Sequence, residues 1–439
     1  MTAVAERYVL TVVDEVIHAL DHPVAPWSIE VELAFAGHID EKRLRAAIGV
    51  ALERHPMARV RLVPSRPFDR EYFWQVTPEA ELDPLQVLEY SDDAQLTEVR
   101  DRLQSIGVPL AESPPFRLRL VHNPDGDRLL LNANHTAFDG FGCLRLLQSV
   151  ARAYTGDPDP SDTVSLTEAR DVRGTLGTDD PTIRIQRGRV LASKTADLAR
   201  APARLATDGG TRQPGYLIVH RSLSVADTQV LATAGGPGTV NDKLVAALHI
   251  AIWKWNYAHH SPSRRISVLM PLNLRPTQWR DDMVTNFVLM SRTLSARPDH
   301  RSPGAVLDAI IAQTERIKDC GRGAALIELL VRSTKLPALL KESVSQLLWL
   351  TGNRLVDTAL ISNLGRLNEP PTFGPEAGET TGLWFSAPAR MPCGLSVGAA
   401  TTAGQLHLSF RCRYPVLDRP AANRFAEDYL AAVSALTEG

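Results

Sequence analysis

The stretch of sequence that decides the fold is Leu129-Leu130-Leu131-Asn132-Ala133-Asn134-His135-Thr136-Ala137-Phe138-Asp139-Gly140. Its apolar first half predicts a buried strand that ends at a turn of the form His-x-x-x-Asp-Gly. An imidazole can accept a proton near neutral pH, which makes His135 a candidate general base. Asp139 is expected to stabilise the turn, and Gly140 to allow a close approach of the backbone. The alternative is a polar turn in which His135 is a half-buried structural histidine.

The length, amino-acid composition and net charge of the chain limit the class of protein to which it can belong. A chain of 439 residues with 44% hydrophobic and 22% charged residues has the balance of a soluble globular protein, and two domains of about 200 residues are expected. The net charge of −2 gives no argument for binding to nucleic acid or to an anionic membrane. The sequence shows neither a leader peptide nor an apolar run of roughly 20 residues, so a cytoplasmic protein without a membrane span is expected.

Metal binding is not indicated by the cysteines. The four cysteines form no CxxC pair, and a structural metal is therefore not expected; they are Cys143, Cys320, Cys393 and Cys412.

The first third of the chain alternates strand and helix patterns. Residues 29–35 alternate apolar and polar side chains, which predicts a half-buried strand. A turn at 123–127 predicts that the strands on either side of it form a hairpin. Further strands are expected at 59–63, 116–121 and 128–134, and helices at 44–52 and 142–154.

The middle of the chain changes character. Residues 155–182 are rich in Asp and Thr and predict a surface crossing. Residues 183–205 predict a helix with one acid, Asp197, against six basic residues, Arg184, Arg187, Arg189, Lys194, Arg200 and Arg204. This basic helix is either a solvated face or a docking surface for an acidic partner.

The second half repeats the mixed pattern, which predicts two α/β halves of similar size. The expected ranges are 1–170 for the first half, 171–215 for a crossing linker with the basic helix, and 216–439 for the second half. Strands are expected at 219–223, 266–270, 358–362, 395–399 and 405–410, and helical regions at 241–255, 303–353 and 420–436.

Several segments in a fixed order make the chain resemble the chloramphenicol-acetyltransferase-like superfamily, in its branch of free-standing acyltransferases of the type associated with polyketide pathways. The superfamily also includes the condensation domains of nonribosomal peptide synthesis. Besides residues 134–140, the resemblance rests on Glu53-Arg54-His55-Pro56, Pro114-Pro115-Phe116-Arg117, Asn241-Asp242-Lys243-Leu244, Pro271-Leu272-Asn273-Leu274-Arg275-Pro276 and Ile361-Ser362-Asn363-Leu364-Gly365. It covers most of the chain.

The resemblance implies a mixed α/β fold, of the two-layer α+β kind, in which two related halves meet in a V around a central tunnel. His135 would lie in mid-tunnel and would deprotonate or orient a hydroxyl or amine acceptor. This acceptor would attack an acyl thioester, carried by coenzyme A or a carrier protein, without an acyl-enzyme. No other cofactor is implied, and a monomer is expected.

The resemblance also implies roles for the residues around His135. Asp139 would be structural and paired with Arg275, although Arg275 at the surface is the alternative. Gly140 would let a backbone amide approach the oxyanion. Asn134, Ser362 and Asn363 would contact the substrate, and a simple turn at 362–363 is the alternative.

Two departures from the superfamily favour a free-standing acyltransferase. Asn134 stands where condensation domains usually carry a first histidine, and Leu383-Trp384-Phe385 is not the Asp-Phe-Gly-Trp-Gly segment of the plant-type branch. His55 is assigned to packing. Two other functions remain open: a non-catalytic domain that recruits a carrier protein, and a different reaction at a bound thioester, such as cyclisation or hydrolysis. The intact His135, Asp139 and Gly140 favour catalysis.

Overall fold

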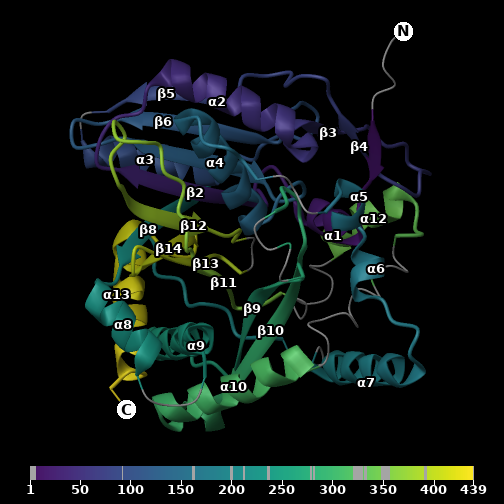
Figure 1. The fold of residues 1–439 in the computed structure, drawn as a ribbon. Helices are drawn as coiled ribbons and strands as arrows, with labels where there is room; N and C mark the ends of the chain where they lie inside the picture. The colour runs from purple at the N-terminus through teal and green to yellow at the C-terminus, as the bar shows by residue number, and fades with distance from the viewer. Residues whose placement is uncertain are drawn as a thin grey trace.

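The computed structural model describes residues 6–90, 92–160, 164–197, 201–210, 213–234, 238–276, 279, 282–319, 330, 334–347, 356–389 and 393–438. Its described strands form three sheets, two large and one small. The two large sheets lie one above the other in Figure 1, each with its own layer of helices. The predicted mixed α/β fold with two halves is therefore confirmed.

The first half contains a five-stranded sheet in the order β12-β2-β7-β6-β5. The predicted hairpin forms β6 and β7, and helices α2 and α4 cover the same face of the sheet. The other face is covered by α3. The bounds are β2 Ser28–Phe35, α2 Glu41–Arg54, β5 Leu85–Glu89, α3 Asp93–Ser105, β6 Phe116–His122, β7 Arg128–Asn134 and α4 Gly140–Thr155.

The second half contains a six-stranded sheet in the order β10-β9-β11-β13-β14-β8. Helices α9, α10 and α13 pack on one face of it and form the second core. The strands are β8 Tyr216–Ser222, β9 Arg265–Asn273, β10 Val288–Ala296, β11 Ala359–Arg366, β13 Leu395–Thr402 and β14 Gln405–Arg413. The helices are α8 Val225–Thr233, α9 Val240–Ala258, a 3₁₀ turn at Arg297–Arg301, α10 Pro303–Asp319 and α13 Arg419–Ala435.

One strand crosses between the halves. β12 (Thr380–Ser386) pairs antiparallel with β2 and therefore completes the sheet of the first half. The expected range 216–439 for the second half is interrupted at this strand. The sequence could not show this, because pairing across such a distance in the chain leaves no local pattern.

A third, small group lies at one side of the molecule (Figure 1). Strands β1 (Arg7–Val9), β4 (Phe73–Val76) and β3 (Val60–Leu62) form a three-stranded sheet, and a 3₁₀ turn at Pro56–Arg59 precedes β3. Helices α1 (Val12–Leu20) and α12 (Ala338–Leu347) contact each other nearby. Lys341 of α12 and Glu15 of α1 form a mostly buried ion pair at 2.9 Å, which joins the two halves.

The described part of the expected surface crossing at 155–182 contains two short helices, and the basic helix follows them. Short helices α5 (Leu166–Ala169) and α6 (Val172–Leu176) are anchored by the buried Arg170, which donates to Asp14 at 2.8 Å. The basic helix forms α7 (Pro181–Asp197), so the expectation that it continues to 205 is wrong. Arg204 lies beyond its end and donates to the backbone carbonyls of Val356 and Asp357, both at 3.1 Å.

Of the expected helical region 303–353, the structure describes α10 and α12, and the remainder lies largely outside the described residues. In the part of the chain that the structure describes, no helix is long and apolar enough to cross a bilayer.

Strand β2 is buried on both faces, so the prediction of a half-buried strand is wrong. Ile29, Val31 and Leu33 face the first core, as the alternation predicts. On the opposite face α3 covers two carboxylates: Arg100 pairs with Glu32, and Gln104 donates to Glu30 at 2.6 Å. Charged side chains had indicated a solvated face, but here they have buried partners.

Candidate active site

His135 lies at the end of β7, where the backbone turns toward α4. It is only 4% exposed, and its backbone amide donates to the carbonyl of Trp27 at 2.9 Å. Its Nδ1 lies 2.7 Å from the carbonyl oxygen of Phe138. Because a carbonyl only accepts, Nδ1 must carry the proton, and the neutral ring presents an unprotonated Nε2. Burial lowers the pKa of this imidazole below its usual 6.5. The neutral, basic form is therefore favoured at neutral pH.

Asp139 and Arg275 form the ion pair that the resemblance implied. Arg275 binds Asp139 through both terminal nitrogens, with Nη2 donating to Oδ1 at 2.9 Å. Both residues are buried, so the surface alternative for Arg275 is wrong. Asp139 is also the N-cap of α4 and accepts a hydrogen bond from the amide of Gly142 at 2.8 Å. One carboxylate thus fixes the turn, starts the helix and ties the first half to the second.

The segment 285–287 of the second half is part of the same site, and the sequence analysis did not find it. The amide of Phe287 donates to Asp139 Oδ2, and Asn286 Nδ2 donates to the carbonyl of His135, both at 2.8 Å. A Cβ on Gly142 would lie 2.6 Å from the carbonyl oxygen of Thr285, so a glycine is needed there. The only sequence signal was a polar Thr-Asn pair before a strand, which is weak.

Asn134 has a structural environment in place of the expected substrate contact. Its Nδ2 donates to Asp21 Oδ2 and to the carbonyl of Val108, both at 2.9 Å. Its Oδ1 accepts a hydrogen bond from the amide of Thr136 at 2.9 Å. Both amide hydrogens and the oxygen are therefore used within the protein, which gives a physical reason for an asparagine at this position.

Gly140 lies where the halves pack against each other. A Cβ there would lie 2.7 Å from Leu364 Cδ2 and 3.0 Å from Phe385 Cε2. This packing accounts for the glycine. Its amide is at the first position of α4, where backbone amides have no partner inside the helix.

The two second-half residues proposed for substrate contact have different positions. Ser362 is a buried residue of β11, two positions before the Leu364 that packs against Gly140. Asn363 accepts a hydrogen bond from the amide of Gly365 at 2.8 Å, and Gly365 has a φ of 75°. Asn363 therefore stabilises a local irregularity within β11, and because the strand continues to Arg366, the alternative of a simple turn is wrong.

Four buried polar atoms around the motif have no hydrogen-bond partner among the described residues. They are Thr136 Oγ1, Thr285 Oγ1, Asn286 Oδ1 and Arg275 Nε. Leaving such an atom unpaired costs about 1–3 kcal/mol. Thr136 follows His135 directly, and Asn286 donates to the His135 carbonyl. The site therefore contains hydrogen-bonding atoms without partners close to the candidate base.

His55 packs away from this chemistry. Its Nε2 lies 2.7 Å from Ser149 Oγ, and burial lowers its pKa to about 3. Among the described residues, no group of three or more His, Cys, Asp or Glu side chains could hold a metal ion.

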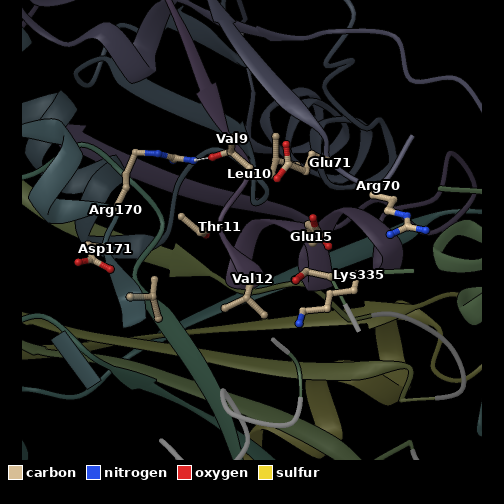
Figure 2. Close-up of a pocket in the computed structure, with 12 residues that line it drawn as sticks. Val9, Leu10, Thr11, Val12, Glu15, Arg70, Glu71, Arg170, Asp171 and Lys335 are labelled. Atoms are coloured by element: carbon tan, nitrogen blue, oxygen red, sulfur yellow. Dashed lines mark hydrogen bonds between the residues drawn. The ribbon is translucent and has the colours of Figure 1, made fainter. Parts of the chain in front are cut away.

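A cavity of about 410 Å³ lies at the N-terminal end of α1, and Figure 2 shows residues that line it. Thr11 and Val12 lie between Arg170 and Asp171 on one side and Arg70 and Lys335 on the other. At the C-terminal end of α1, Asp21 accepts the hydrogen bond from Asn134, which adjoins His135. The nine residues of α1, which rise about 13 Å in total, thus lie between the cavity and the residue that adjoins His135.

Comparison with known proteins places this site in a family. The family model described as "Condensation domain" matches residues 16–165, which include the whole motif. An uncharacterized protein of Mycobacterium tuberculosis, Rv2305 of strain H37Rv, is 36% identical over 426 residues, covering 96% of this chain and 97% of that protein. The chain belongs to the condensation-domain family.

Solved condensation domains have the same fold. The first condensation domain of the calcium-dependent antibiotic synthetase, in complex with a substrate analogue, gives a TM-score of 0.72 at 14% identity, covering 98% of this chain and 96% of that one. The starter condensation domain of rhizomide synthetase, in complex with C8-CoA, gives 0.68 at 15% identity, covering 99% and 95%. At these identities the likeness concerns the fold alone.

Proposed function

We propose that this condensation-domain protein transfers an acyl group from a thioester to a hydroxyl or amine acceptor, with His135 as the general base. The observation that carries the proposal is the tautomer of His135. The Phe138 carbonyl holds the proton on Nδ1, so Nε2 is the basic nitrogen. Burial favours the neutral ring.

The reaction balances without an acyl-enzyme. His135 Nε2 takes the proton from the acceptor hydroxyl or amine as its oxygen or nitrogen attacks the thioester carbonyl carbon. A tetrahedral oxyanion forms, and then the carbon–sulfur bond breaks. The leaving thiolate takes the proton back from Nε2, which yields an ester or amide and a free thiol.

The chain offers groups for the other demands of this reaction. The Gly140 amide at the positive end of α4 is our candidate donor to the oxyanion. Asp139 and Arg275 keep the turn rigid, so that the base does not have to be reoriented during the reaction. The unpaired oxygens of Thr136, Thr285 and Asn286 would bind polar groups of the donor or acceptor.

The choice of donor for a first assay comes from a structural neighbour. The rhizomide starter domain was solved with C8-CoA, so octanoyl-coenzyme A is a rational first donor here. A thioester of a phosphopantetheinyl carrier protein carries the same reacting group. We place both donors within the proposed substrate class.

The experiment is a mass-spectrometric transfer assay with octanoyl-coenzyme A, octanoyl-carrier protein and a panel of alcohols and amines. Wild type should form an acylated product, and His135→Ala should form it at least about 10²-fold more slowly, because the base is lost. Thermal melting of both proteins tests that the variant is folded.

Three outcomes would contradict the proposal. Equal rates in wild type and His135→Ala would remove the base role. No transfer with any donor, while the protein still binds a carrier, would favour the non-catalytic recruiting domain. Loss of the thioester without any added acceptor would point to hydrolysis or cyclisation.

A further inference from the structure

Helix α7 makes no extensive contact with the other described elements. Figure 1 shows it at the lower right, below α6 and with one end of α10 beside it in this view, and no described helix or strand packs along its length. Residues 181–189 are exposed, apart from the half-buried Arg187. Two of the exposed residues are isoleucines, Ile183 at 39% and Ile185 at 57%.

Physical chemistry does not favour such a helix in isolation. Most of the stability of a helix in a protein comes from packing of one face, which the 17 residues of α7 lack among the described elements. Gly188 near its middle costs about 1 kcal/mol relative to alanine. The exposed isoleucines add apolar surface that gains from being covered. These features are those of a helix whose surface is completed by a partner.

The charge of α7 indicates which partner. It carries four basic residues, Arg184, Arg187, Arg189 and Lys194, against the single acid Asp197, although the whole chain has a net charge of −2. The helix is therefore a local basic surface on a weakly acidic protein. Because the chain as a whole does not attract polyanions, an acidic protein surface with apolar contacts suits α7 better than nucleic acid.

The position of α7 relates this surface to the cavity of Figure 2. Arg170, Asp171 and Val172 line that cavity, and Figure 2 shows Arg170 and Asp171 on one side of it. Val172 also begins α6, which leads directly to α7. A partner seated on α7 would thus lie on the same side of the molecule as the cavity.

We infer that α7 is the docking helix for an acidic carrier protein that presents the acyl group on its phosphopantetheine arm. This inference rests on the proposed function and adds the partner and its surface to it. Glutamates and aspartates of the carrier would pair with Arg184 and Arg189, and apolar side chains of the carrier would cover Ile185, which lies between these two arginines around the helix. The coenzyme A thioester has no such protein surface and would not depend on α7.

The test compares the same octanoyl group on two donors, a coenzyme A thioester and a carrier-protein thioester. Octanoyl-coenzyme A and an octanoyl-loaded acidic carrier protein of a bacterial fatty acid synthase are the donors. The variant is Arg184→Glu with Arg189→Glu, both exposed. The matched control is Lys42→Glu with Arg102→Glu, two exposed reversals on α2 and α3. For the carrier-bound donor, KM should rise at least about tenfold in the α7 variant and stay unchanged in the control.

With octanoyl-coenzyme A, both variants should keep the wild-type KM and kcat, which also shows that they are folded. Raising the salt concentration should increase the carrier KM of the wild type more than that of the α7 variant, because exposed charge pairs are screened. An unchanged carrier KM in the α7 variant would overturn the inference, as would an equal rise for both donors.

Failure of the proposed function is distinguishable from failure of docking. If neither donor gives product, fluorescence anisotropy of the dye-labelled carrier still measures docking, and a Kd that the α7 reversal weakens about tenfold supports the inference. A Kd that does not change overturns it. Sedimentation with phosphatidylglycerol vesicles, lost in the α7 variant while carrier binding is unaffected, would assign the helix to a lipid surface instead.

Discussion

At the scale of single residues, the tautomer of His135 makes a pH prediction. Burial lowers the pKa of the ring below 6.5, so the neutral base persists into more acidic solution than for an exposed histidine. Protonation of Nε2 abolishes the base, and kcat/KM should therefore rise with pH through the shifted pKa and level off above it. We expect the acidic limb of the profile, measured with octanoyl-coenzyme A between pH 4.5 and 8, to have its midpoint below 6.5. A midpoint at or above 6.5 would mean that the ring is not desolvated in the working enzyme.

The environment of Asn134 makes a second residue-scale prediction. Asn134→His should reduce the free energy of unfolding by about 1–3 kcal/mol, because one imidazole cannot serve Asp21, the Val108 carbonyl and the Thr136 amide together. Urea unfolding measures this loss. Gln86→His, at an exposed position of β5, is the control and should change stability by no more than about 0.5 kcal/mol. An Asn134→His variant as stable as that control would refute the structural role.

Residue identities in the motif could be predicted from the sequence, whereas several residue roles could not. The spacing His-x-x-x-Asp-Gly and the resemblance identified His135, Asp139 and Arg275, because these side chains act within one turn or on it. The reason for Gly140 depends on Leu364 and Phe385, which lie far along the chain. The role of Asn286 could not be predicted for the same reason, because its contact with His135 exists only after the two halves have packed together.

At the scale of elements, strand β2 predicts how stability depends on pH. Burial raises the pKa of Glu30 well above its usual value, so the folded protein keeps a proton that the unfolded chain has released above about pH 4.5. The proton on Glu30 therefore makes its full contribution to the free energy of unfolding below about pH 4.5. This contribution is lost as the pH rises toward the pKa that Glu30 has in the folded protein. Glu30→Gln should therefore match wild type at pH 4 and exceed it at higher pH, by up to about 1.4 kcal/mol for each pH unit within that window. Urea unfolding at several pH values measures this difference, and Glu89→Gln, at an exposed position of β5, should give none.

The sequence correctly located the long helices and strands, in which apolar residues recur with a clear period. The helices α2, α4, α9 and α13 and the hairpins β6–β7 and β13–β14 lie where periodicity predicted them. Strand β1 is three residues long, which is too short to show a period. The end of α7 was misplaced because the basic residues continue beyond Asp197, and charge alone does not mark where a helix ends.

At the scale of the whole molecule, the two halves are joined by contacts of different kinds. Strand β12 adds backbone pairing to the first sheet, Lys341 pairs with Glu15, and Arg275 binds Asp139. The last pair is buried and lies at the candidate base, so it couples the packing of the halves to the geometry of the site. The sequence could suggest the Asp139–Arg275 pair but not β12, because the resemblance concerns motifs and β12 contains none.

Removing one member of the Asp139–Arg275 pair should therefore affect stability and catalysis together. Arg275→Ala leaves Asp139 buried without its counter-charge, and we expect a loss of about 3–5 kcal/mol in the free energy of unfolding. Arg221→Ala, which breaks a more exposed pair with Glu427 at 2.8 Å, is the control and should cost no more than about 1 kcal/mol. Urea unfolding compares the two variants, and the octanoyl-transfer rate should fall only in Arg275→Ala. If the two variants lost equal stability, β12 and the Lys341–Glu15 pair would carry the association of the halves. The ion pair would then serve the motif turn alone, and Arg275→Ala would lower the transfer rate without loosening the molecule.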